Sequence, residues 1–287
     1  MTAVLMPGGP VADAVLDSLR PRIEALVAAG GRPGLGTILV GDDPASAGYI
    51  RMKQERCADL GIHSAHQHLG AGASQGALLS AVQAFNAADE VDAMLVQHPT
   101  PPQIDYEAAL AAMDPDKDAD GLHPLNMGRL ALSMPGPVPC TPAGIEALLA
   151  HYEVPVAGRH VVVLGRGFTL GRPLALLLTQ KRPTANAAVT VVHTGVADWP
   201  EHTRRADIVI AAAGVPGILQ PDNVRPGAVV VGGGVRYEGR RILPDVDEAV
   251  AEVAGWITPR VGGVGPTTVA MLLANTVAAA ESRRARV

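Results

Sequence analysis

The hydrophobic positions of the chain alternate between two spacings, and this alternation predicts an α/β protein. Apolar residues recur at helical spacing from Ala12 to Ala29 and from Gln75 to Ala87. Short continuous apolar runs bounded by Gly, Pro or Asp lie between such segments, at Gly36–Val40 and Ala93–Val96. Runs of this kind are typical of strands buried on both faces of a parallel sheet. The first part of the chain is therefore predicted to consist of βαβ units.

A second set of elements begins near Thr141. This residue is predicted to cap a helix from Pro142 to Tyr152, since Thr and Pro are favoured at the start of a helix. A further helix is expected from Arg172 to Gln180, and a final one from Thr267 to about Glu281. The apolar runs of this part predict parallel strands at His160–Leu164, Val189–Val192, Ile208–Ala211 and Ala228–Val231.

The composition of the chain bounds its size class and its partners. With 287 residues, of which 48% are hydrophobic and 18% charged, the chain can form two medium-sized cores, so we expect two domains. A net charge of -5 argues against binding to nucleic acid or to an anionic membrane surface. The Arg-rich end at residues 283–286 is expected to be a solvated tail.

Cysteine usage and the N-terminus favour a cytoplasmic protein. Cys57 and Cys140 are far apart in sequence and form neither a disulfide framework nor a spaced set of metal ligands, so no metal is expected. The first ten residues lack the basic segment and the longer apolar segment of a signal peptide. No apolar run is long enough to span a bilayer. We therefore expect a soluble cytoplasmic protein with no membrane partner.

One helix carries a pair of residues suited to catalysis. Tyr49 and Lys53 stand four positions apart after a turn-rich segment, so they share a helical face, with Cβ atoms roughly 5–6 Å apart. An aromatic ring and a tunable amine can then address one small molecule. Taken alone, this spacing is more often a surface lysine beside a partly buried tyrosine. Gln97 follows the strand at 93–96 and enters a proline-rich loop, at the end of the strand where α/β sheets bind ligands.

A glycine-punctuated turn between a strand and a helix predicts a dinucleotide site. It contains Gly165, Arg166, Gly167 and Gly171, and glycines let the backbone approach a pyrophosphate. The last glycine comes one residue later than the common spacing, so a plain strand-to-helix turn is the alternative. NAD sites usually have an acidic residue at the end of the next strand, but here Thr194 lies near that position. Arg166 and the Thr194 hydroxyl could contact a 2′-phosphate, so NADP is favoured over NAD.

Several stretches of the sequence carry long and specific motifs. They are Asp43–Lys53, Leu95–Gln97 with the prolines that follow, Lys117–Pro124, Pro139–Pro142, Gly165–Pro173 and Gly262–Pro266. On these motifs, the chain resembles the bifunctional methylenetetrahydrofolate dehydrogenase/methenyltetrahydrofolate cyclohydrolase family from about Gly36 to Thr276. Agreement by chance at so many ordered positions is negligible.

The resemblance implies two consecutive reactions in one cleft. The first is the NADP-dependent oxidation of 5,10-methylenetetrahydrofolate to the 5,10-methenyl cation, and the second is its hydrolysis to 10-formyltetrahydrofolate. Lys53 is the expected catalyst of hydrolysis, because partial burial and the adjacent cation disfavour an ammonium group and suit the amine to activating water. Gln97 is implied to hydrogen-bond Lys53 and to steer its proton. Tyr49 would pack against the folate, and Asp120 would hold the pterin through paired hydrogen bonds.

The same resemblance implies two α/β domains with the active-site cleft between them. Residues 1–122 and 268–287 would form a tetrahydrofolate-binding domain, completed by the C-terminal helix, and residues 123–267 a Rossmann-like NADP-binding domain. A homodimer through the nucleotide domain is also implied. The expected substrate contacts are Tyr49, Gln97, Asp120, Gly262, Gly263 and Pro266. The expected cofactor contacts are Gly165, Arg166, Gly167, Gly171, Thr194 and Val235.

The chain departs from the family pattern at several positions. Gly167 replaces a serine whose hydroxyl could bind the 2′-phosphate, which predicts weaker NADP binding. His98 and Thr100 replace two leucines of the proline-rich loop. Gly232 stands where an aspartate is usual, and Val261 where a proline precedes the double glycine. These departures leave two rival functions: a dehydrogenase with little cyclohydrolase activity, and a non-catalytic homologue that binds folate or nucleotide.

Overall fold

The structure, a computed structural model, describes residues 2–238 and 241–285, which fall into two compact units. Unit 1 comprises the residues up to 13 together with 130–133 and 139–271. Unit 2 comprises residues 14–129, 134–138 and those from 272 onward. Two of the boundaries between the units fall inside long helices, α1 (Gly8–Ala28) and α9 (Val264–Arg284).

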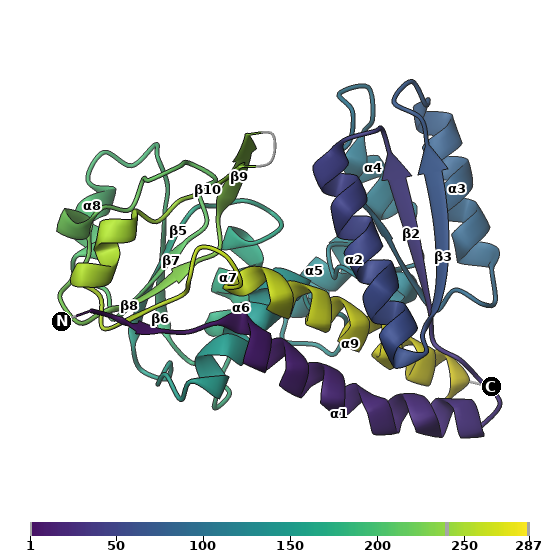
Figure 1. Ribbon diagram of the computed structural model, residues 1–287, viewed down its shortest axis with the longest axis horizontal. Helices are drawn as coiled ribbons and strands as arrows, with labels where there is room; N and C mark the ends of the chain where they lie inside the picture. Colours follow the sequence, from purple (N-terminus) through teal and green to yellow (C-terminus); the bar gives the residue numbers. More distant parts are fainter. Residues whose placement is uncertain (1, 239–240, 286–287) are drawn as a thin grey trace. The chain divides into compact units, whose positions relative to one another are not determined.

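The described residues of unit 1 form a parallel six-stranded sheet in the order β1-β11-β8-β7-β5-β6. Its strands are β1 (Val4–Leu5), β5 (His160–Leu164), β6 (Ala188–Val192), β7 (Ile208–Ala211), β8 (Val229–Gly232) and β11 (Trp256–Ile257). Figure 1 labels β5, β6, β7 and β8 of this sheet. Parallel pairing of β5 with β6 and β7, and of β7 with β8, confirms the four strands predicted for this part of the chain.

Both faces of this sheet are buried, which explains the continuous apolar runs. Along β5, Val161 and Val163 belong to one hydrophobic cluster, whereas Val162 and Leu164 belong to another, because successive side chains of a strand point to opposite faces. The first cluster includes residues of the helices α6 (Cys140–His151) and α7 (Gly171–Leu178). A strand with helices or loops on both faces reads as uninterrupted Val, Ile and Leu.

The N-terminal strand divides the chain differently from the expected domains. Residues 1–122 were expected to belong together, but β1 pairs with β11 in the sheet of unit 1. The reason lies in backbone hydrogen bonds: Val4 N–H donates to the Gly255 carbonyl and Met6 N–H to the Ile257 carbonyl, both at 2.8 Å. Two residues of strand are too short for a periodic signal, so the sequence pattern did not reveal this pairing.

Helix α6 begins earlier than expected. Thr141 was expected to cap it, but the helix begins at Cys140 with Pro139 as the N-cap residue, and no side chain caps it. Thr141 therefore lies within the first turn, and its hydroxyl accepts a hydrogen bond from the Thr268 hydroxyl at 3.2 Å instead. The unit also contains a short helix α8 (Trp199–Thr203), the antiparallel pair β9 (Val235–Glu238) and β10 (Arg241–Pro244), and the 3-10 turns η2 (Pro221–Asn223) and η3 (Glu248–Glu252).

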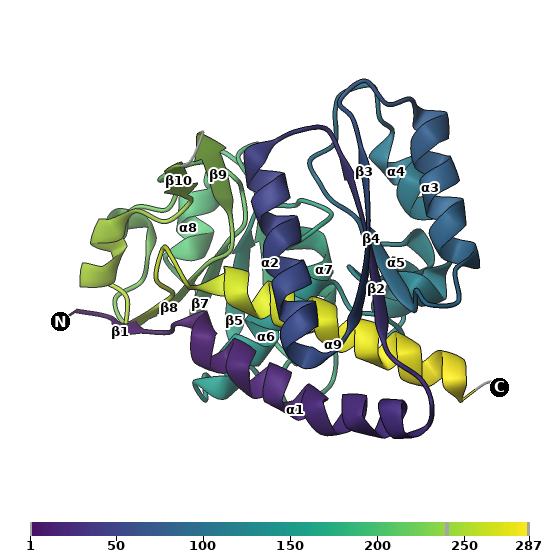
Figure 2. The same cartoon turned by 45° about the vertical axis from the view of Figure 1, so that its right-hand side comes forward.

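In the part of unit 2 that the structure describes, β2 (Gly34–Val40) is the centre of a parallel three-stranded sheet between β3 (His63–Leu69) and β4 (Ala93–Val96). Helices α2 (Pro44–Leu60) and α3 (Gln75–Ala87) pack against strands of this sheet (Figures 1 and 2). Also present are α4 (Tyr106–Ala111), η1 (Pro115–Lys117) and the start of α5 (Pro124–Ala131).

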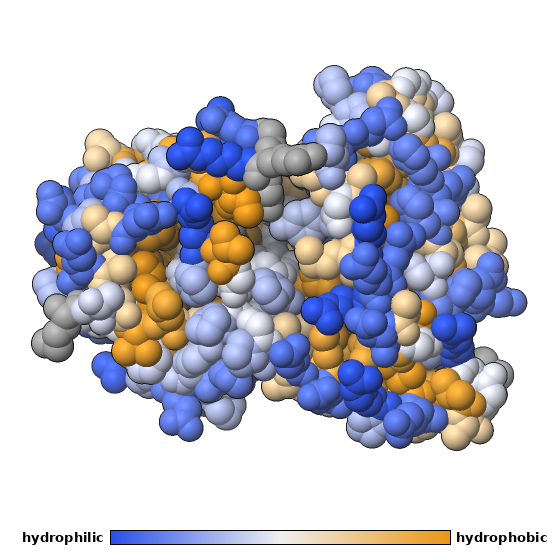
Figure 3. Space-filling view, in the orientation of Figure 1, coloured by the Kyte–Doolittle hydropathy of each residue, from blue (hydrophilic) through white to orange (hydrophobic). Residues whose placement is uncertain are grey.

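The edge strand β3 was not predicted from the sequence. It carries polar residues on both faces, His66 and His68 are exposed, and hydrophilic side chains gather over it in the space-filling view (Figure 3). It nevertheless pairs with β2 over seven residues. An edge strand buries little surface, so its register is set by backbone pairing and leaves no apolar run to detect.

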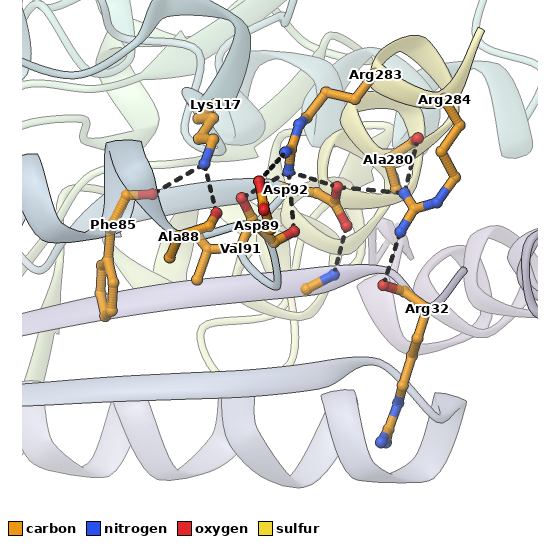
Figure 4. Close-up of polar contacts among 11 residues, drawn as sticks. Arg32, Phe85, Ala88, Asp89, Val91, Asp92, Lys117, Ala280, Arg283 and Arg284 are labelled. Atoms are coloured by element: carbon orange, nitrogen blue, oxygen red, sulfur yellow. Dashed lines mark hydrogen bonds and ion pairs between the residues drawn. The ribbon is translucent and has the colours of Figure 1, made fainter. Parts of the chain in front are cut away.

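The C-terminal helix is tied to unit 2 by Asp92, a carboxylate that is 1% exposed (Figure 4). Its Oδ1 atom lies 3.0 Å from Nη1 of Arg283 and 3.2 Å from Nη1 of Arg284, and its Oδ2 atom accepts the Gly34 N–H at 3.0 Å. The expectation of a solvated Arg-rich tail is therefore wrong for these two arginines, while residue 286 lies outside the described residues. The expectation that the last helix completes the first domain is confirmed.

Candidate active site

Helix α2 presents the predicted pair of Tyr49 and Lys53. The helix begins at Pro44 because Asp43 caps it: the Asp43 carboxylate accepts the Ser46 N–H at 2.7 Å. Lys53 is only 8% exposed and Tyr49 is partly buried. The alternative of a surface lysine is therefore wrong. A lysine buried to this degree requires polar partners, since an isolated buried ammonium group is costly.

Gln97 supplies such a partner for Lys53. The Nζ atom of Lys53 donates to Oε1 of Gln97 at 2.9 Å, so the contact implied by the resemblance is present. The other end of the same amide is also fixed, because Nε2 of Gln97 donates to the His98 carbonyl at 2.8 Å. With both ends of its amide engaged, Gln97 holds its oxygen toward the lysine in one orientation. Its place directly after β4 puts this pair at the carboxyl end of the sheet.

The departure from the family at His98 produces an aromatic contact with Tyr106. The two rings meet edge-on, with centroids 4.9 Å apart and an angle of 67° between the planes. Burial lowers the pKa of the His98 imidazole. Burial also raises the pKa of the Tyr106 phenol, and the negative charges of Asp120 and Asp118 raise it further. Tyr106, which the sequence did not single out, therefore links the loop after β4 to the two aspartates.

Asp118 organises the turn that carries Asp120. Its buried carboxylate accepts the backbone N–H of Gly121 at 2.9 Å, the backbone N–H of His123 at 2.8 Å and the side-chain amide of Asn126 at 2.9 Å. Asp118 is thus occupied with the local backbone. Asp120 lies two residues later and is partly buried. The sequence pattern contained both aspartates but did not reveal these contacts of Asp118.

The predicted dinucleotide turn follows β5 in unit 1. Gly165 has φ +135°, and a Cβ atom there would overlap the Ala212 carbonyl oxygen. A Cβ atom at Gly171 would overlap the Gly165 carbonyl oxygen, whereas one at Gly167 would meet nothing within 4 Å. Two of the glycines therefore allow close backbone packing, and the third faces open space. Arg166 is exposed beside them.

These residues fit a dinucleotide. The turn leads directly into α7, an eight-residue helix whose first N–H groups are suited to a pyrophosphate. Thr194 is exposed just beyond β6, and the His193 ring accepts the Gly195 N–H at 3.1 Å, which holds that turn. The end of β6 thus carries a hydroxyl where an NAD site would carry a carboxylate. Val235, at the start of β9, is 38% exposed.

The glycine-rich loop before α9 packs closely within unit 1. Gly262 has φ +77°, and its carbonyl accepts the Gly8 N–H at 2.8 Å. A Cβ atom on Gly8 would overlap the Gly263 carbonyl oxygen, so the start of α1 lies directly against this loop. The glycines therefore have a structural reason of their own, and Val261 beside them is 67% exposed. Their contact with substrate, together with that of Pro266, stays a prediction.

Two protein-family models match the chain, one over each of the two parts that carry these sites. Residues 6–120 match the model of the tetrahydrofolate dehydrogenase/cyclohydrolase catalytic domain, and residues 139–284 match that of the NAD(P)-binding domain. The chain belongs to the tetrahydrofolate dehydrogenase/cyclohydrolase family. The bifunctional protein FolD 1 of Salinispora tropica is 64% identical over 97% of this chain and 91% of its own length. The bifunctional protein FolD of Syntrophotalea carbinolica is 62% identical over 100% and 99%, respectively.

A solved structure of the tetrahydrofolate dehydrogenase/cyclohydrolase family supports the cofactor. The Trypanosoma brucei enzyme, complexed with NADP and an inhibitor, superposes with a TM-score of 0.92 at 38% identity, over 100% of both chains. Membership in the family confirms the expected two-domain α/β fold, the bifunctional enzyme class and NADP as the cofactor. Over residues 2–238 and 241–285, no helix combines the length and apolarity needed to cross a membrane.

Proposed function

We propose that this enzyme oxidises 5,10-methylenetetrahydrofolate with NADP and then hydrolyses the methenyl product to 10-formyltetrahydrofolate, with Lys53 and Gln97 carrying the hydrolysis. The observation that carries the proposal is the 2.9 Å hydrogen bond between these side chains at a buried position. The presence of both residues argues against the rival of a dehydrogenase with little cyclohydrolase activity, because this pair is what the proposed hydrolysis requires.

In the hydrolysis, Lys53 acts as the general base. A buried amine beside a cationic substrate gives up its proton more readily than a solvated one, so Nζ is suited to accept a proton from water. Water then adds to the methenyl carbon as Nζ takes one of its protons. The hydroxyl group of this adduct loses its remaining proton to solvent as the formyl C=O bond forms, the bond from the carbon to N5 breaks, and N5 takes the proton from Nζ. Gln97 holds Nζ through Oε1 during this transfer. Its own amide is held by the His98 carbonyl, so the pair needs little reorganisation.

Substrate is held by residues of the same sheet end and of the glycine-rich loop. Tyr49 packs against the aromatic body of the folate from the same helical face as Lys53. Asp120 accepts paired hydrogen bonds from the pterin, while Asp118 keeps its turn in place through Gly121 and His123. The remaining substrate contacts of the proposal are Gly262, Gly263 and Pro266.

For the oxidation, the chain's own residues bind and orient the reactants. When bound, NADP supplies the hydride acceptor. The residues proposed to hold it are Gly165, Arg166, Gly167, Gly171, Thr194 and Val235. Arg166 and the Thr194 hydroxyl favour a 2′-phosphate over a free 2′-hydroxyl, since no carboxylate follows β6 directly.

The proposal extends to assembly and setting. The strand β6 is an edge of the six-stranded sheet within the described residues, and Val191 on it is 39% exposed. An open edge with an exposed β-branched residue supports a homodimer through unit 1. Two features support a cytoplasmic setting: the chain has no disulfide framework, and its chemistry depends on NADP.

An absorbance assay tests the proposed function. Purified protein is given 5,10-methylenetetrahydrofolate with NADP or NAD in parallel, and the methenyl compound in a separate reaction. We expect turnover in both reactions and faster oxidation with NADP. Binding of either ligand without turnover would instead support the rival of a non-catalytic homologue. The loss of activity would then be attributed to the departures from the family at positions 167 and 232.

A further inference from the structure

Asp245 is a buried carboxylate that none of the roles above uses. It follows β10 in unit 1, and it is 0% exposed to solvent. Its Oδ2 atom accepts the backbone N–H of Ala213 at 2.6 Å and that of Gly214 at 2.9 Å. A Cβ atom at Gly234 would overlap the same oxygen. The chain can therefore place this carboxylate against the two amides only because residue 234 is glycine.

The amides that Asp245 holds belong to the turn at the carboxyl end of β7. The preceding residue, Ala212, donates its N–H to the Leu164 carbonyl at 2.7 Å. Its own carbonyl lies where a Cβ atom of Gly165 would be, so this turn packs directly on the first glycine of the dinucleotide turn. Asp245 thus fixes the neighbour of the glycine turn that is proposed to hold NADP. In open α/β sheets, cofactors bind outside these carboxyl ends.

Stabilising the turn alone does not require an aspartate at position 245. Burial raises the pKa of the Asp245 carboxyl, although the amides of Gly214 and Ala213 lower it. Its Oδ1 atom has no hydrogen-bond partner among residues 2–238 and 241–285. Burying a carboxylate with one unsatisfied oxygen costs free energy that an apolar side chain would avoid. We therefore expect the two hydrogen bonds to the turn to serve a function that compensates for this cost in stability.

We propose that Asp245 is a positioning residue for NADP, which holds the turn at 212–217 rigid against the glycine turn at 165–171. The inference rests on the proposed NADP contacts of unit 1. A turn whose amides are already tied down needs no ordering when the cofactor binds, so less binding free energy is lost. Hydrolysis of the methenyl compound uses Lys53 and Gln97 of unit 2 and consumes no cofactor, so it is independent of Asp245.

Substitution of Asp245 with alanine and with asparagine tests this role. Asp245→Ala removes the acceptor, and we expect the KM for NADP to rise about tenfold or more. We expect hydrolysis of the methenyl compound by the same preparation to stay within about twofold of the wild type, because its residues lie elsewhere. In Asp245→Asn, the amide oxygen can still accept both N–H groups, so the KM for NADP should return close to the wild-type value.

A second variant keeps the test decisive if Asp245→Ala does not fold. Gly234→Ala leaves the carboxylate in the chain but displaces it from the two amides, and it should raise the KM for NADP in the same way. An unchanged KM in both variants, or a parallel fall in hydrolysis, would overturn the inference. An asparagine variant as impaired as the alanine variant would also overturn it. A wild-type protein that shows no NADP-dependent oxidation would instead overturn the proposed function on which it rests.

Discussion

Nζ of Lys53 donates a hydrogen bond to Oε1 of Gln97 at 2.9 Å, which joins residues 44 positions apart in the sequence. The lysine comes from the middle of α2 and the glutamine from the loop after β4. Both elements flank the central strand β2 of unit 2. The packing of α2 and β4 against one strand thus brings an amine and an amide into contact, and we propose that the hydrolysis depends on this contact.

Removal of the glutamine partner should slow hydrolysis more than it disturbs the fold. Gln97→Ala leaves the amine of Lys53 without its oriented acceptor, and we expect the initial rate of methenyl hydrolysis to fall about 10- to 100-fold. The matched control is Gln103→Ala, which removes an exposed amide of the same loop. If the two side chains act as a unit, Gln97→Ala should cause little further loss when Lys53 is already methionine. Fully additive losses would contradict a shared role.

The open space at Gly167 should accept the hydroxyl that the family usually has there. A Cβ atom at this position meets nothing within 4 Å, so Gly167→Ser is expected to fold normally. A hydroxyl donor near a 2′-phosphate should lower the KM for NADP about threefold to tenfold and leave the KM for NAD unchanged. Gly171→Ser is the control, because its Cβ atom would overlap the Gly165 carbonyl oxygen and should disrupt the turn. Equal gains with NADP and NAD would contradict the argument.

The thiol of Cys57, one turn of α2 beyond Lys53, should be unreactive in the folded protein. Burial raises its pKa to about 12, and the charge of Lys53 opposes only part of this shift. We therefore expect slow labelling by iodoacetamide at about pH 8, and fast labelling once guanidinium chloride unfolds the chain. The pKa of this thiol is higher in the folded protein than in the unfolded chain. Its contribution to stability is therefore complete below about pH 8.5, the pKa of an unfolded cysteine, and is lost as the pH rises through the pKa of the folded thiol. Rapid labelling that a Cys57→Ala variant lacks would show that the thiol is accessible.

The tie between Asp92 and the last helix should contribute measurably to stability. Asp92→Ala leaves Arg283 and Arg284 without their carboxylate and the Gly34 N–H without its acceptor, so we expect a loss of about 2–4 kcal/mol in the free energy of unfolding. Asp89→Ala provides the control. Asp89 is fully exposed and its Oδ1 atom lies 3.6 Å from Nη2 of Arg283, so its removal should leave the urea midpoint nearly unchanged. Similar urea midpoints for the two variants would contradict this difference.

The sequence predicted the elements whose burial dictates their composition. β5, β7 and β8 are buried on both faces, and their continuous apolar runs revealed them. The edge strand β3 and the two-residue strand β1 escaped, because neither has a run of apolar residues with a regular period. Their places in the two sheets are set by backbone pairing with distant segments, which no local pattern reports.

For the candidate site, too, the sequence revealed local spacing but not tertiary contacts. Tyr49 and Lys53 share a helix, so their spacing was visible in the sequence. The burial of Lys53 and its link to Gln97 are tertiary, and only the resemblance to a family indicated that contact in advance. Nothing in the sequence indicated that the Asp118 carboxylate is held by the backbone of its own turn, and the buried Tyr106 carried no signal.

The most direct test of the account is the rate of methenyltetrahydrofolate hydrolysis by Lys53→Met. Methionine fills a similar volume without the amine, so the fold and NADP binding should persist while hydrolysis falls at least about a hundredfold. Lys181→Met, at an exposed position, is the matched control and should hydrolyse the substrate at the wild-type rate. Hydrolysis by Lys53→Met at a rate close to that of Lys181→Met would contradict the assignment of the reaction to Lys53.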